Sequence, residues 1–165
     1  MNREKIFAAL ETLEIADVLV TALSSDKQKS FYAARVLEHK ASSGPEKFAP
    51  FIPVFLSAVV EVKHPSVMRI FAKILSAITD QKSSFCSSSS IDSFDFDPVV
   101  KTLFTWLIDL NSPVAVKVHC MQSLANLTPR YDWISEELLS TIERFEAVES
   151  PAYFARAKQI RKKLK

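Results

Sequence analysis

The chain has 165 residues, a length that fits one domain with a substantial hydrophobic core. Apolar residues make up 48% and charged residues 24%, with a net charge of +2, as in water-soluble globular proteins. Gly44 is the only glycine, and hairpin turns and phosphate-binding loops both depend on glycine. The composition therefore argues against a β-rich fold and a Gly-rich nucleotide loop, and it predicts an all-α protein.

Apolar residues at helical spacing predict three helices in the first quarter of the chain, over residues 2–13, 15–23 and 27–40. Asp26 is suited to cap the third helix, because its carboxylate can accept hydrogen bonds from the first amides. The dipeptide Gly44-Pro45 then separates this helix from the next segment.

Residues 46–62 also carry apolar side chains at helical spacing. Because Pro50 and Pro53 each remove a backbone donor, we expect a kink in the first turn, or a regular helix that starts near Ala49. His64-Pro65 begins a further helix with a broad apolar face.

Residues 82–97 interrupt this pattern with the serine-rich sequence KSSFCSSSSIDSFDFD, which has no helical period. We interpret the segment as a surface insertion or disordered loop, with a phosphorylated segment or a lid as alternatives. Asp97-Pro98 is then predicted to cap a helix that ends near Leu110.

Short apolar helices recur along the chain, and each begins after a proline or a capping residue and follows another helix. The residues at these helix starts are Asp26, Pro65, Pro113 and Pro151. They are 39, 48 and 38 residues apart, and the interval of 48 residues contains the serine-rich segment. Two helices in about 40 residues is the period of HEAT and armadillo repeats. We expect one domain, residues 1–165, with about four helix pairs in an α-α superhelix; a single closed bundle is the alternative.

Three phrases near the C-terminus carry a family resemblance: KVHCMQSLANL, YDWISEEL and SPAYFARAKQIRKK. They resemble the C-terminal signature of a family of small bacterial HEAT-like helical-repeat proteins, over residues 117–163. Cys120, Ser123, Pro151 and the serine-rich segment depart from that signature. The resemblance implies an α-helical HEAT-like fold without an established function.

Members of that family are often labelled adenylosuccinate lyase. The lyase superfamily has much longer chains and a signature loop in which serines precede Met-Pro-x-Lys-x-Asn. The run Ser87–Ser90 has none of the residues that follow the serines in that loop. Lyase activity is therefore the third functional hypothesis, and no catalytic residue is assigned.

Two further groups of residues have both a structural and a functional interpretation. Trp106 and Asp109 are the types that HEAT-like DNA glycosylases use, but their spacing favours a core tryptophan and a solvated carboxylate. Asp132 is expected to cap the following helix, with Trp133 packed on the preceding helix pair.

Arg69 and Lys117 each follow a helix-starting proline by four residues. This equivalence predicts a ladder of contacts between repeats, to turn carbonyls or carboxylates, rather than a ligand site.

His119, Gln122 and Asn126 fall at i, i+3 and i+7 and form one polar stripe on a predicted helix. In HEAT-like arrays the second helix of each pair lines the concave surface, where partners dock. The stripe is either a binding surface or an ordinary exposed one.

The last helix is strongly basic, so the remainder of this chain of net charge +2 is acidic, at −4. The helix has six basic and no acidic residues from position 156 onward: Arg156, Lys158, Arg161, Lys162, Lys163 and Lys165. It can serve as a polar cap of the array, as a phosphate-binding face or as a dock for an acidic protein.

The sequence favours a non-enzymatic binding module with a protein partner, and nucleic-acid binding through the basic helix is the alternative. The cysteines, Cys86 and Cys120, have the spacing of neither a disulfide framework nor a metal site. The N-terminus lacks the continuous apolar core of a signal peptide, and no run is long enough to span a bilayer. We expect a cytoplasmic protein without metal, cofactor or membrane association; the oligomeric state is left open.

Overall fold

The computed structural model describes residues 2–85 and 89–165, and within these ranges all regular structure is helical. The first half contains α1 (Arg3–Glu11), α2 (Ile15–Ala22), α3 (Lys27–Ser43), α4 (Pro45–Phe48), a 3-10 turn (Ala49–Phe51), α5 (Ile52–Val59) and α6 (Pro65–Thr79). The second half contains α7 (Ser89–Asp92), α8 (Asp97–Ile108), α9 (Val114–Leu127), α10 (Trp133–Phe145), a 3-10 turn (Glu146–Val148) and α11 (Pro151–Leu164). The all-α prediction is confirmed for these residues.

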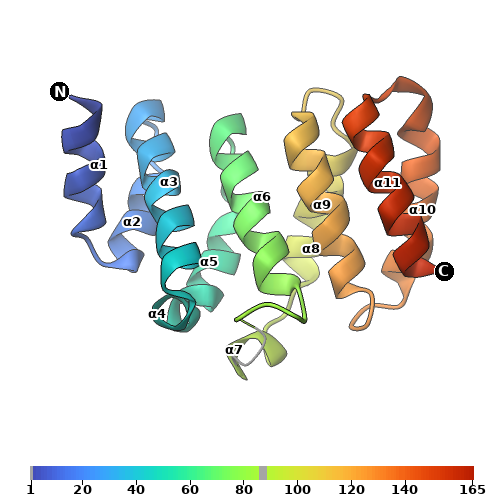
Figure 1. Cartoon of the computed structure of the whole chain (residues 1–165), viewed down its shortest axis with the longest axis horizontal. Coiled ribbons are helices and arrows are strands. Elements are labelled where there is room, and N and C mark those ends of the chain that lie inside the picture. Colours follow the sequence, from blue (N-terminus) through green and yellow to red (C-terminus); the bar gives the residue numbers. More distant parts are fainter. Residues whose placement is uncertain (1, 86–88) are drawn as a thin grey trace.

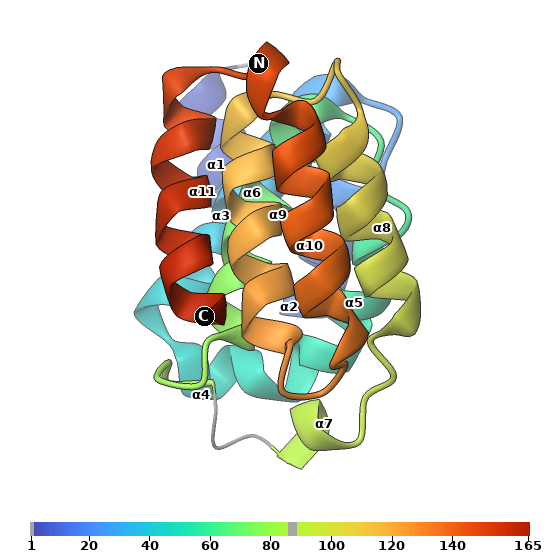
Figure 2. The same cartoon turned by 90° about the vertical axis from the view of Figure 1, so that its right-hand side faces the viewer.

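The helices form two rows (Figure 1). Helices α1, α3, α6, α9 and α11 lie side by side in the order in which they contact one another, and we call them the front row. Helices α2, α5, α8 and α10 lie behind them as the rear row, and the view from the α10–α11 end shows the two rows as layers (Figure 2). The chain alternates between the rows, so the second helix of each successive pair belongs to the front row.

Apolar faces of the two rows pack against each other and form a continuous core. In α6 the predicted broad apolar face is buried throughout, and Phe71 at its centre stacks on Phe55 of α5 with ring centroids 4.9 Å apart. Burying one such aromatic side chain contributes about 2–3 kcal/mol relative to leaving it in water. This face explains why α6 contacts neighbours in both rows.

Capping and proline positions set the helix boundaries in the first half. The carboxylate of Asp26 accepts hydrogen bonds from the amides of Gln28 and Lys29 at 3.0 Å, which confirms the predicted cap of α3. Pro50 lies in the 3-10 turn that divides the predicted helix of residues 46–62. The regular helix α5 therefore begins at Ile52, three residues later than the sequence suggests.

Neither of the other two predicted caps makes a side-chain capping bond, although Asp132 does occupy the N-cap position of α10. Asp97 is the first residue of α8 and its carboxylate pairs with Lys101 at 3.1 Å instead of capping the helix. Asp132 has helical dihedral angles and makes no side-chain capping bond to α10. The predicted packing of Trp133 is confirmed, because its ring stacks on Phe104 of α8 at a centroid distance of 6.0 Å.

The serine-rich segment is more closely packed than an exposed spacer. Phe85 and Phe96 are both buried, and the Phe96 amide donates a hydrogen bond to the Tyr131 hydroxyl at 3.1 Å. Between them, residues 89–92 form the short helix α7. Of the two interpretations, the described part of 82–97 fits a surface insertion that is held at Phe85 and Phe96, whereas Cys86, Ser87 and Ser88 lie outside the described residues.

Candidate functional site

Polar side chains from α9 and α11 meet on the front row. Arg156 Nη1 donates to Gln122 Oε1 at 2.7 Å, and Gln122 Nε2 donates to Asn126 Oδ1 at 3.0 Å. Lys163 Nζ donates to the same Asn126 oxygen at 2.5 Å. The polar stripe of α9 and two of the predicted basic residues of α11 thus form one hydrogen-bonded network.

The network continues onto α6 through Asn126, which is only 7% exposed. Its Nδ2 donates to the Ser76 carbonyl at 3.3 Å and to the Thr79 hydroxyl at 3.2 Å. Ser76 Oγ in turn lies 3.4 Å from His119 Nδ1. Asn126 therefore joins α6, α9 and α11 from within, whereas His119 and Gln122 are half-buried at the surface.

His119 lies among cations from two neighbouring helices. Burial lowers the pKa of His119 below its usual 6.5, and the positive charges of Arg156, Lys73 and Arg69 lower this pKa further, against an opposing effect of Glu38. The desolvated imidazole is thus kept neutral by its surroundings near pH 7. An anion that binds beside the imidazole would raise this pKa.

A pocket opens on the front row between α3 and α6, and we call it the α3–α6 pocket. Its volume is about 450 Å³. In its lining Lys73 Nζ donates to Glu38 Oε1 at 2.6 Å, and Arg35 lies 3.7 Å from the same carboxylate. Its apolar lining includes Phe7, Ile74 and Ala77. The pocket lining therefore combines apolar side chains with charged ones.

The basic residues of α11 point to different sides. Arg161 donates two hydrogen bonds to Glu146, at 2.6 and 2.8 Å, and these bonds lower the pKa of the Glu146 carboxyl. Arg161 and Glu146 line a shallow hollow of about 420 Å³ together with the exposed Lys158, Lys162 and Lys165 and with Phe154, which is 40% exposed. The predicted basic face is thus divided: Arg156 and Lys163 bond to side chains of α9, and the other four basic residues share one outer surface.

The predicted contact between repeats is confirmed for Lys117, which pairs with the Glu149 carboxylate in the turn before α11, but Arg69 does not occupy an equivalent place. Pro65 is the first residue of α6, whereas Pro113 precedes α9 as its cap. The two basic residues are therefore one position out of register, which is about 100° around a helix. Lys117 is 2% exposed and forms an ion pair with Glu149, while Arg69 is exposed on the front row.

Trp106 and Asp109 have the structural roles that their spacing favours. Trp106 is 7% exposed within the core, and so it is not available to stack on a nucleic-acid base. The Asp109 carboxylate accepts a hydrogen bond from the Asn111 amide at 2.9 Å in the turn after α8.

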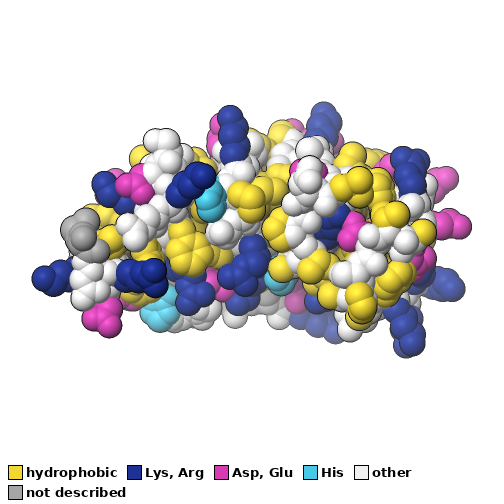
Figure 3. Space-filling view, turned by 90° about the horizontal axis from the view of Figure 1, so that it is seen from above, with side chains coloured by type: hydrophobic (Ala, Val, Ile, Leu, Met, Phe, Trp, Pro, Cys, Tyr) yellow, Lys and Arg dark blue, Asp and Glu magenta, His cyan; other side chains and the backbone are white. Residues whose placement is uncertain are grey.

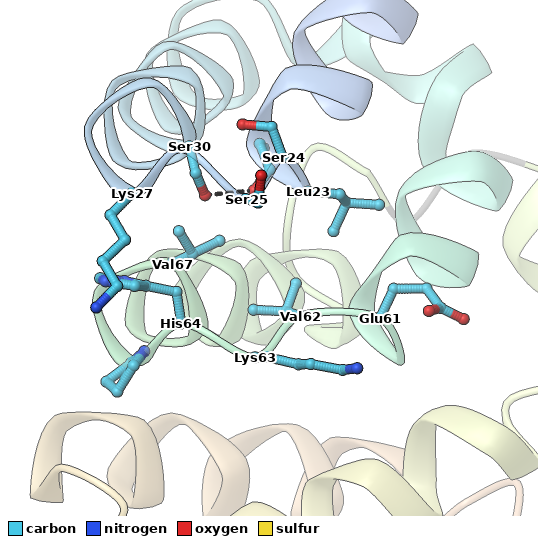
Figure 4. Close-up of a pocket in the computed structure, with 12 residues that line it drawn as sticks. Leu23, Ser24, Ser25, Lys27, Ser30, Glu61, Val62, Lys63, His64 and Val67 are labelled. Carbon is cyan, nitrogen blue, oxygen red and sulfur yellow. Dashed lines mark hydrogen bonds between the residues drawn. The ribbon is translucent and has the colours of Figure 1, made fainter.

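A second pocket, of about 650 Å³, lies between the α2–α3 and α5–α6 turns. Leu23 and Val62 point into the space between these turns, with Lys27 and His64 to one side and Lys63 to the other (Figure 4). Sequence reasoning missed it because its walls come from turns that are distant in sequence. Seen from the end where these turns lie, Lys and Arg side chains are interspersed with acidic and hydrophobic ones (Figure 3).

Sequence reasoning also missed Arg35, Glu38 and Lys73. Their signal was present, since they are polar residues at helical spacing on α3 and α6, but only the packing of those helices brings them to one pocket.

Among the described residues, no three or more His, Cys, Asp or Glu side chains are grouped so as to hold a metal ion. None of the described helices combines the length and apolar character needed to cross a membrane. Comparison with protein-family models, curated proteins and solved structures finds no match for the chain.

Proposed function

We propose that the chain is a non-enzymatic binding module, built as a HEAT- or armadillo-like superhelix, that receives a protein partner on its front row. The alternation of the chain between two rows supports this architecture, because each successive pair adds one helix to the same face. Such a face is an extended surface built from side chains that are distant in sequence.

One observation carries the proposal: a charged and an apolar feature adjoin on the front row. Arg69, Lys73, His119 and Arg156 come together from α6, α9 and α11, and Lys73 also lines the α3–α6 pocket. A pocket with apolar lining beside polar groups is typical of sites where a partner inserts an anchoring side chain. The Ser76 hydroxyl lies 3.4 Å from His119 Nδ1, but it donates to the Lys73 carbonyl at 2.8 Å, which argues against its activation by the imidazole.

A nucleic-acid partner is the second candidate, and it concerns the outer surface of α11. There Phe154 lies among Lys158 and Lys162, a combination that suits base stacking beside phosphate contacts. Two other basic residues that would extend this surface are engaged elsewhere. Lys117 is buried against Glu149, and Arg130 donates to the Asp92 carbonyl. This division of the basic residues favours the protein partner.

The test asks whether variants with a bulky side chain on one row or the other still bind a protein partner. Ala77 is exposed in the α3–α6 pocket, and Thr105 is exposed on α8 of the rear row. Affinity capture from the cells that produce the protein should retain a specific protein with the wild type and Thr105→Trp, and lose it with Ala77→Trp. The same protein should bind when both are purified. Equal retention by all three would refute the front-row proposal.

A further inference from the structure

We propose, resting on the front-row function above, that the partner presents an acidic peptide segment with one apolar anchor. Its carboxylates would lie against Arg69, Lys73 and Arg156 beside His119, and its anchor would enter the α3–α6 pocket.

The charge balance of this part of the front row is positive. The groups whose charges act on His119 are Arg69 and Lys73 of α6, Arg156 of α11, and Glu38 of α3. Glu38 is the one acid among them within the described residues, and it already pairs with Lys73. This pair compensates the charge of Lys73, so Arg69 and Arg156 carry the excess positive charge of the cluster. The remaining cations attract an anionic partner and repel a basic one.

These cations come from two helices, and a peptide with several carboxylates can contact both. Helix α9 lies between α6 and α11, so the charges of Arg69 and Arg156 act on His119 from the helices on either side of it. A run of carboxylates can offer one anion to each guanidinium group, and the adjoining pocket with apolar lining favours a peptide over a free phosphate. Arg156 uses Nη1 for Gln122, and the guanidinium has further donors for a carboxylate.

The α3–α6 pocket supplies the place for the apolar anchor. Its volume of about 450 Å³ is within the range of pockets that bind small apolar groups. Ile74 and Ala77 of its lining lie on α6 next to Lys73 of the charged cluster. An apolar side chain flanked by acidic residues can therefore occupy the pocket while its neighbours meet the cations.

His119 gives this interaction a pH dependence. A carboxylate beside the imidazole favours its protonated form, so binding takes up a proton and tightens as the pH falls below neutral. Before a peptide binds, the charges of Arg69, Lys73, Arg156 and Glu38 act on the pKa of His119, in addition to its burial. The Asp and Glu side chains of the peptide stay ionised in this range.

The experiment uses a fluorescein-labelled synthetic peptide of Asp and Glu with one central Phe, titrated with the full chain at low salt and followed by anisotropy. Arg69→Glu should weaken binding about fivefold or more, since it removes one attraction and adds a repulsion. The matched control is Lys101→Glu on α8, whose side chain is 77% exposed, and it should leave binding unchanged. Circular dichroism verifies that each variant is folded.

The anchor and the pH dependence are tested with the same probe. Replacing the peptide Phe by Ala and introducing Ala77→Trp should each weaken binding, and the two effects should not add. His119→Gln should flatten the pH dependence.

Three results would each overturn the inference: no binding of the peptide, equal binding by Arg69→Glu, or loss of binding in Lys158→Glu/Lys162→Glu instead. If a cellular protein is still lost with Ala77→Trp while the peptide does not bind, the front-row function stands and only the acidic-segment inference fails.

Discussion

The ion pair between Lys117 and Glu149 tests the packing of α11 on α9 most sharply. The two side chains are 2% and 9% exposed, and they connect α9 to the turn that precedes α11. Removing one partner leaves an uncompensated buried charge, which costs about 3–5 kcal/mol of unfolding free energy. Lys117→Met and Glu149→Leu should each be destabilised by this amount, whereas the double variant should recover most of the loss because no buried charge remains.

Urea unfolding followed by circular dichroism and tryptophan fluorescence measures this effect. With a denaturant slope of about 2 kcal/mol per molar, each single change lowers the midpoint by about 1.5–2.5 M. Lys101→Met provides the matched control, because the Lys101–Asp97 pair is exposed and contributes at most about 1 kcal/mol. Single variants at Lys117 or Glu149 that behave like this control, or a double variant that shows the sum of both losses, would refute the buried pair.

Two further predictions concern buried titratable groups. Because the pKa of His119 is lowered on folding from 6.5, the unfolded chain binds more protons, so the unfolding free energy falls as the pH drops below about 6.5. Urea titrations across this range should show a smaller fall for His119→Gln, and an identical profile would contradict the prediction. Burial raises the pKa of the Cys120 thiol. In a Cys86→Ser variant, Ellman's reagent should therefore modify Cys120 only as fast as the protein unfolds; rapid labelling of the folded protein would disprove the burial.

Local signals in the sequence predicted most helix positions correctly. Asp26 caps α3 because capping depends on neighbouring amides alone, and the apolar period of α6 is visible without knowledge of its neighbours. Two of the errors arose where a boundary depended on a shift of one residue. Asp97 lies within its helix, and Pro65 and Pro113 differ in position relative to theirs.

The candidate site was only partly predictable, because its residues meet through packing. The polar stripe of α9 was visible, but nothing local indicates that Arg156 donates to Gln122 or that Asn126 is buried against α6. The basic face of α11 was predicted as one surface for a similar reason. Its division depends on α9, whose Gln122 and Asn126 accept hydrogen bonds from Arg156 and Lys163. The sequence therefore shows which polar residues share one face of a helix, and the tertiary contacts decide which of these residues are free to face a partner.

The central claim is that a protein docks on the front row, and site-specific photocrosslinking in the producing cells tests it most directly. A photoreactive amino acid placed at position Ala77 should give a discrete protein adduct that survives nuclease treatment. The same group placed at Thr105 on the rear row should not. An adduct formed only at Thr105, an adduct removed by nuclease, or none at Ala77 would contradict the claim.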